Sequence, residues 1–145
     1  MAIVMETNSG RIRSMIGLEC KDDSSYVRAD SLAEVRHSSA LVQTVSMLAA
    51  LNPGKAKQDT NEKTPMQLIT LYNAIANNGK MVTPLLYEPL RQTNEGAKVS
   101  SPQMASSVNI KDIQKMLEEN VTNGLGKRAQ SDLFAVAGKD GTTYN

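Results

Sequence analysis

Residues 64–79 carry signals for both ends of a helix, and this constrains the fold more than any other stretch of the chain. Thr64 can cap the free N–H groups of a first turn, and Pro65 suits the first helical position, where its missing N–H is not needed. Asn77-Asn78-Gly79 then supplies residues that tolerate the left-handed backbone of a helix end. Between these signals the apolar residues recur at helical spacing, as Leu68, Leu71, Tyr72 and Ile75. The sequence therefore predicts an amphipathic helix here.

Two further helices are predicted, one on each side of the first. One lies within Leu32–Leu51, where apolar residues are three and four positions apart, and Asn52-Pro53-Gly54 ends it. The other covers Ile110–Val121 and begins after Ser107 or Asn109, either of which can cap a helix.

The predicted strands lie at the two ends of the chain. Ala2–Thr7 and Arg11–Leu18 are β-rich runs separated by Asn8-Ser9-Gly10, a pattern typical of a hairpin. Residues 19–31 are polar and predict a loop, whereas Phe134–Ala137 predicts a strand. The order of elements indicates an α+β fold, with a small antiparallel sheet of N-terminal hairpin and C-terminal strand packed with about three helices. A length of 145 residues fits one domain, residues 1–145.

Composition excludes some function classes. The net charge is +1 and only 3% of residues are aromatic, which gives no support to nucleic-acid binding. No run approaches the roughly 18 apolar residues of a transmembrane helix, so no membrane segment is expected. Cys20 and His37 form the one conceivable thiol–base pair, but a lone Cys in a polar stretch is more often incidental, and His37 is more often a surface residue.

Three segments, in the same order, resemble the transpeptidase domain of class B penicillin-binding proteins. The hairpin AIVMETNSGRIRSMIGL resembles the first two strands of that domain, and TPMQLITLYNAIANNGKMVTP resembles its T-P-x-Q segment. The end, VAGKDGTT, resembles V-A-G-K-T-G-T, the strand that borders the active-site cleft. The resemblance implies a reduced transpeptidase-like or β-lactamase-like fold and a role in cell-wall peptidoglycan synthesis.

The family's nucleophile motif is altered in this sequence. The family uses a serine in an S-x-x-K motif, whose lysine lies one turn later on the same helix face and can accept the serine proton. No serine of this chain has a lysine three positions later, and the resemblance aligns Ala40 and Gln43 with the motif's serine and lysine. Alanine cannot attack a carbonyl and an amide cannot act as the base, so we expect no catalytic residues. Neighbouring Ser39 is turned away by about 100° on a helix.

The other family motifs are also altered. The lobe that normally carries S-x-N is replaced by a few polar residues between Lys55 and Thr64, and Ser107-Val108-Asn109 is better explained as a helix cap. The K-T-G motif keeps its lysine but has Asp140 in place of threonine, which would offset the positive charge. The resemblance leaves a remnant ligand-binding set at the end of the chain: Lys139, Gly141, Thr142 and Thr143.

The sequence thus favours a catalytically inactive, transpeptidase-related domain, a pseudoenzyme. The alternatives are a fragment or miniaturised core of an active D,D-transpeptidase and a purely structural or partner-binding module. No metal or cofactor is expected, and the partner is a peptidoglycan peptide, a cell-wall protein or a second copy joined through an open sheet edge. The compartment is not encoded in this chain, although the family resemblance implies a periplasmic or other extracytoplasmic location.

Overall fold

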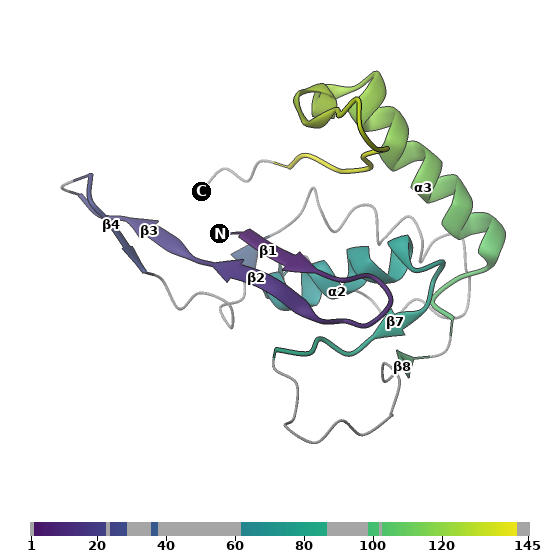
Figure 1. Ribbon diagram of the computed structural model, residues 1–145, viewed down its shortest axis with the longest axis horizontal. Coiled ribbons are helices and arrows are strands. Elements are labelled where there is room, and N and C mark those ends of the chain that lie inside the picture. Colours follow the sequence, from purple (N-terminus) through teal and green to yellow (C-terminus); the bar gives the residue numbers. More distant parts are fainter. Residues whose placement is uncertain are drawn as a thin grey trace.

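The computed structural model describes residues 2–22, 24–28, 36–37, 62–86, 99–101 and 103–141. Within these ranges the protein is α+β, as expected, with two α-helices, a 3-10 turn and four antiparallel strand pairs. Helix α2 (Pro65–Ala76) contacts β1 (Ala2–Met5), β7 (Met81–Val82) and α3 (Ser107–Thr122). It therefore lies at the centre of the described elements (Figure 1).

The N-terminal hairpin is confirmed. Strand β1 pairs antiparallel with β2 (Ile12–Ile16), and the register runs from Ala2 opposite Ile16 to Met5 opposite Ile12, with an irregularity after Val4. The chain turns between the strands with Gly10 in a left-handed conformation, at a φ of 75°. Because glycine has no Cβ, it adopts this conformation without steric cost.

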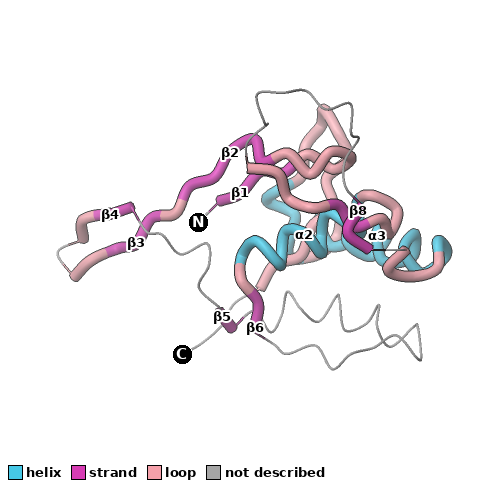
Figure 2. Tube along the Cα trace, turned by 90° about the horizontal axis from the view of Figure 1, so that it is seen from below, coloured by secondary structure: helices cyan, strands magenta, loops and turns pink. Residues whose placement is uncertain are grey.

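A second hairpin occupies the region predicted to be a loop. Strand β3 (Leu18–Cys20) pairs antiparallel with β4 (Tyr26–Arg28). Both views show this hairpin projecting away from the helices (Figures 1 and 2). Its side chains are largely exposed, with Tyr26 at 70%. This strand pair contributes little to the core, so its sequence lacks the hydrophobic alternation that predicts a strand. The polar turn between the strands therefore led to the prediction of a loop.

Helix α2 begins and ends where the sequence predicted. Thr64 Oγ1 accepts a hydrogen bond from Gln67 N at 3.2 Å, and Gln67 Oε1 accepts one from Thr64 N at 2.9 Å. These reciprocal bonds form a capping box that satisfies two free N–H groups of the first turn. At the other end Gly79, at a φ of 90°, donates its N–H to the Ala74 carbonyl at 2.7 Å.

Two short strand pairs flank α2. Strand β5 (Arg36–His37) pairs with β6 (Glu62–Lys63) immediately before the helix, and β7 pairs with β8 (Val99–Ser101) after it. The predicted helix within Leu32–Leu51 lies outside the described residues except for Arg36–His37, which are extended. The described part of the chain therefore holds two α-helices where about three were expected.

Helix α3 provides half of the buried hydrophobic residues in the described part of the chain. It begins after Ser106, whose Oγ accepts a hydrogen bond from Asn109 N at 3.2 Å, so the cap lies one residue before the predicted Ser107. Its buried face packs on α2, and its end leads into a 3-10 turn, η1 (Leu125–Ala129). The buried cluster comprises Ile75, Ala105, Ile110, Ile113 and Leu117, with Tyr72 and Met104 packed against it.

The predicted C-terminal strand is wrong. Residues 133–141 form no strand, and Phe134 is 66% exposed. The segment instead lies along α3, where Gly138 N donates to the Leu117 carbonyl at 3.1 Å and Asn120 Nδ2 donates to the Gly138 carbonyl at 2.9 Å. Because α3 satisfies both backbone groups of Gly138, this residue does not need a neighbouring strand. The expected sheet of three strands is thus a two-stranded hairpin, and the dimer through its open edge stays a prediction.

Candidate functional site

The remnant of the K-T-G motif is held against the last turns of α3. Asn120 makes this attachment, because its Nδ2 donates to the Gly138 carbonyl at 2.9 Å and to Asp140 Oδ1 at 3.2 Å. Gly138 has room beside the helix, since an added Cβ would meet Val121 at an ordinary 3.7 Å. Asn120 could not be singled out from the sequence, because it is one of several polar residues near the end of a predicted helix.

The ammonium group of Lys139 contacts the adjacent residue, Asp140. Lys139 Nζ donates to the Asp140 backbone carbonyl at 2.6 Å and lies 3.4 Å from Asp140 Oδ1. Two oxygens of Asp140 therefore already contact the ammonium group. The aspartate in place of the motif's threonine had suggested that the charge of Lys139 is offset. Gly141 follows directly, whereas Thr142 and Thr143 lie outside the described residues.

The Asp140 carboxylate is stabilised in its charged form. A hydrogen bond with its own backbone lowers the pKa of Asp140, the Asn120 side-chain amide lowers it further, and Lys139 adds a smaller effect in the same direction. Partial burial opposes these effects without reversing them. Asp140 consequently stays negative at neutral pH and continues to offset the charge of Lys139.

The positions aligned with the nucleophile and base, Ala40 and Gln43, lie outside the described residues. Cys20 is exposed in β3, with its thiol 3.5 Å from the Lys21 carbonyl. His37 belongs to β5, and nothing is described of its side chain. Among the described residues no group of three or more His, Cys, Asp or Glu side chains could hold a metal ion.

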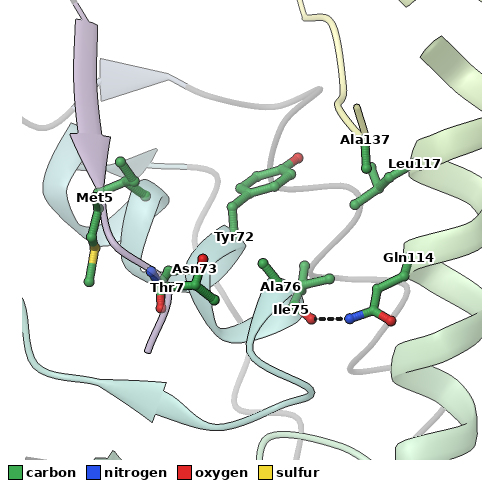
Figure 3. Close-up of a pocket in the computed structure, with 10 residues that line it drawn as sticks. Met5, Thr7, Tyr72, Asn73, Ile75, Ala76, Gln114, Leu117 and Ala137 are labelled. Carbon is green, nitrogen blue, oxygen red and sulfur yellow. Dashed lines mark hydrogen bonds between the residues drawn. The ribbon is translucent and has the colours of Figure 1, made fainter. Parts of the chain in front are cut away.

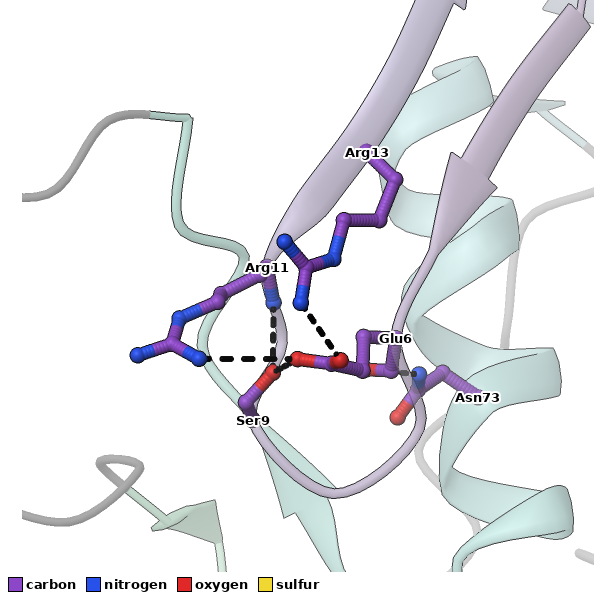
Figure 4. Close-up of polar contacts among 5 residues, drawn as sticks. All are labelled: Glu6, Ser9, Arg11, Arg13 and Asn73. Carbon is purple, nitrogen blue, oxygen red and sulfur yellow. Dashed lines mark hydrogen bonds and ion pairs between the residues drawn. The ribbon is translucent and has the colours of Figure 1, made fainter.

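A second polar cluster surrounds the turn of the N-terminal hairpin (Figure 4). Glu6 accepts hydrogen bonds from Ser9 Oγ and from Arg13 Nη2, the latter at 2.8 Å, and Arg11 Nη1 lies 3.9 Å away. Asn73 Nδ2 on α2 donates to the Glu6 backbone carbonyl at 3.2 Å. This cluster ties the hairpin turn to the central helix.

The cluster makes stability depend on pH. The hydrogen bond from Ser9 lowers the pKa of the Glu6 carboxyl most, followed by that from Arg13. A carboxyl whose pKa is lowered by folding adds stability above its unfolded pKa, near 4.3 for glutamate, and that stability is lost as the pH falls through the folded value. We expect Glu6→Gln to flatten the loss of unfolding free energy between neutral and acidic pH, measured by urea titration at several pH values.

Glu118→Gln, which removes an exposed carboxylate of α3, is the matched control and should change the pH profile less. Because Glu6 is accessible to solvent, solvent and salt weaken its ion pairs, and the difference should shrink in high salt. Identical pH profiles for Glu6→Gln and wild type would refute this account of the hairpin cluster.

The sequence itself matches the model of a protein family. The model of the penicillin binding protein transpeptidase domain matches residues 42–145, which include α2, α3 and the segment around Lys139. The chain belongs to the penicillin-binding protein transpeptidase family. That family is linked to peptidoglycan synthesis. Because the matched range includes the T-P-x-Q and K-T-G segments, their resemblance to the family is confirmed. Comparison with curated proteins and with solved structures gives no significant match.

Two of the family's motif segments can be matched to elements of the structure. The T-P-x-Q segment is α2, whose capping box accounts for its threonine and glutamine. The K-T-G segment keeps its lysine and glycine but not its threonine. Within the part of the chain that the structure describes, no helix is long and apolar enough to cross a membrane.

Proposed function

We propose that this chain is a class B transpeptidase relative that forms no acyl-enzyme and serves peptidoglycan synthesis by binding. The observation that carries the proposal is that no serine of the chain is followed three positions later by a lysine, and the resemblance aligns Ala40 and Gln43 with the family's serine and lysine. Acyl transfer by this family needs an activated hydroxyl, and neither an alanine methyl group nor a glutamine amide can supply the nucleophile or its base.

The contacts of Lys139 support the same conclusion. In a site that recognises a negatively charged substrate, the lysine charge must be available to the substrate. Here Asp140 engages that charge from the adjacent position, at 3.4 Å from Nζ to Oδ1. Asp140 thereby weakens attraction for an anionic group while leaving hydrogen-bond donors in place.

The binding role is assigned to the same segment. Lys139, Gly141, Thr142 and Thr143 provide an ammonium group, backbone groups and two hydroxyls that suit an extended peptide. The ligand class proposed is a peptidoglycan peptide, with a cell-wall protein as the alternative partner. Since Asp140 offsets Lys139, we infer that neutral or amidated peptide ends bind better than free carboxylates.

Restoring the two missing side chains tests whether the rest of the site, with Asp140 and without the S-x-N lobe, could still support transpeptidation. We expect Ala40→Ser combined with Gln43→Lys to leave turnover of a thioester substrate at the background of the wild-type chain. When catalytic groups act together, removing one of them lowers the kcat of the enzyme by about 10⁶-fold, so partial repair of a site recovers little activity. Asp140 still engages Lys139 in this variant, and the S-x-N lobe is still missing.

A circular dichroism spectrum matching the wild type would exclude unfolding as the reason for inactivity. Robust turnover by the double variant would show that Ala40 and Gln43 are the decisive defects, and that the missing S-x-N lobe and Asp140 matter less than proposed.

A further inference from the structure

The Asn120 side chain lies near the end of α3, close to two glycines of the turn that follows. A Cβ added at Gly124 would lie 2.8 Å from Asn120 Oδ1, and one added at Gly126 would lie 3.1 Å from Asn120 Nδ2. Gly124 caps η1 and Gly126 belongs to it. The turn therefore has glycines at two positions where a larger residue would displace or crowd the Asn120 amide.

The Asn120 amide group donates to two acceptors of the C-terminal segment. One is the Gly138 carbonyl at 2.9 Å and the other is Asp140 Oδ1 at 3.2 Å, so the nitrogen of the amide must face them. The segment also meets α3 at Leu117, whose carbonyl accepts from Gly138 N at 3.1 Å and beside which Ala137 lies (Figure 3). The backbone thus has a second attachment to α3, whereas Asn120 supplies the described contact between α3 and the Asp140 carboxylate.

The ion pair between Asp140 and Lys139 is weak on its own. Asp140 Oδ1 lies 3.4 Å from Lys139 Nζ, and the two side chains are 41% and 30% exposed. Such a pair contributes little by itself, because solvent screens it and both side chains lose freedom. Asn120 stabilises the carboxylate in addition: after the bond with its own backbone, the Asn120 amide lowers the pKa of Asp140 most. A group that fixes the carboxylate therefore decides how fully it offsets the lysine charge.

We propose that Asn120 sets the charge preference of the Lys139 segment by holding the Asp140 carboxylate against Lys139. Asn120 acts through Asp140 and is therefore a positioning residue. While the carboxylate is held, the segment presents little net charge to the end of a peptide. Without Asn120 the carboxylate turns to solvent part of the time, and Lys139 is left to attract a free carboxylate. The inference rests on the proposed function for the class of ligand, but not for the contact between Asn120 and Asp140.

An NMR titration without ligand tests the positioning. In the wild-type chain the Lys139 side-chain signals should follow the protonation of Asp140, because the carboxylate lies beside Nζ. In Asn120→Ala the pKa of Asp140 should rise, since the amide no longer stabilises the charged form, and the Lys139 response should weaken. Asn123→Ala removes the same side-chain atoms from an exposed residue at the end of the same helix, and should behave like the wild type.

Peptide binding tests the charge preference. The probes are an acetylated dipeptide of D-alanine with a free carboxylate and the same dipeptide with an amidated end. The wild-type chain should prefer the amide, and Asn120→Ala should reduce the ratio of the two affinities roughly two- to fivefold, the range for a partly exposed ion pair. Asp140→Asn should reduce the ratio at least as much. Adding Asn120→Ala to Asp140→Asn should change the ratio no further, because Asn120 acts through the Asp140 carboxylate.

The combined variant separates positioning from a merely structural role. Asn120→Leu keeps the size of the side chain beside the glycine turn and should give the same results as Asn120→Ala, which protects the test against collapse of that turn. The proposal is overturned if the Lys139 response is unchanged in both Asn120 variants, or if Asn120→Ala shifts the ratio equally with and without the Asp140 carboxylate. If the wild-type chain binds neither dipeptide, the proposed function fails, and the NMR titration still decides whether Asn120 holds the carboxylate against Lys139.

Discussion

Ile110→Ala should lower the unfolding free energy by about 2 to 5 kcal/mol, the range for truncating a fully buried aliphatic side chain. Ile110 is 0% exposed and belongs to the cluster that joins α2 to α3. Removing three carbons there forfeits apolar burial and leaves a cavity that the helix pair can close only in part. A domain has about 5 to 15 kcal/mol of stability in total, so the variant should approach the limit of folding.

Urea titration monitored by helical circular dichroism measures this loss. Val108→Ala is the matched control, because it truncates a side chain on the same helix that is 65% exposed. Its effect should stay within about 0.5 kcal/mol, as for most surface substitutions. Equal midpoints for the two variants would mean that the α2–α3 contact is not the core of this protein.

Gly10→Ala should destabilise the N-terminal hairpin by at least about 2 kcal/mol, since a non-glycine residue costs about 1 to 2 kcal/mol in left-handed backbone alone. The added Cβ would also lie 2.4 Å from the Thr83 backbone carbonyl oxygen, a distance that forces the backbone to move. The Gly10 carbonyl accepts from Leu85 N at 2.8 Å, so any shift disturbs the join between hairpin and central segment.

Gly138→Ala is the control for this second prediction, because its Cβ would find only an ordinary contact with Val121 at 3.7 Å. Both variants should be compared by thermal unfolding and by amide hydrogen exchange at residues 11–16. Faster exchange there in Gly10→Ala, and not in Gly138→Ala, is the expected pattern. If Gly10→Ala unfolds at the wild-type temperature, the turn does not have the conformation described here.

The best sequence predictions came from residues whose chemistry marks the end of an element. Thr64, Pro65 and Gly79 correctly predicted the two ends of α2, because capping and left-handed termination depend on local backbone groups alone. The Asn8-Ser9-Gly10 turn likewise located the first hairpin. Local signals succeed where the energy that selects the conformation is itself local.

The errors arose where distant contacts decide the structure. Phe134–Ala137 has the composition of a strand, but strand formation needs a neighbouring strand, and α3 satisfies the Gly138 backbone instead. The β3–β4 hairpin was missed for a different reason: its residues are largely exposed, so they lack the hydrophobic alternation that predicts a strand. Neither outcome follows from propensity within a short window.

The candidate site was predictable in its motifs and not in its contacts. The sequence placed Asp140 beside Lys139, and adjacency alone made the charge compensation foreseeable. The attachment through Asn120 depends on how the C-terminal segment meets α3, and the contact of Asn73 with Glu6 depends on how the hairpin turn meets α2. The sequence specifies neither arrangement. In α2, Asn73 lies between the apolar Tyr72 and Ile75, and a polar residue so close to a predicted buried face is the signal to look for.

Intact-mass spectrometry after prolonged incubation with a fluorescent penicillin tests the central claim most directly. A serine transpeptidase with an unaltered S-x-x-K motif, treated in parallel, should become stoichiometrically labelled and so show that the reagent is active. This chain should keep its unmodified mass, because Ala40 and Gln43 provide no acylatable nucleophile and no base. A stoichiometric adduct on any serine, or on Cys20, would contradict the account.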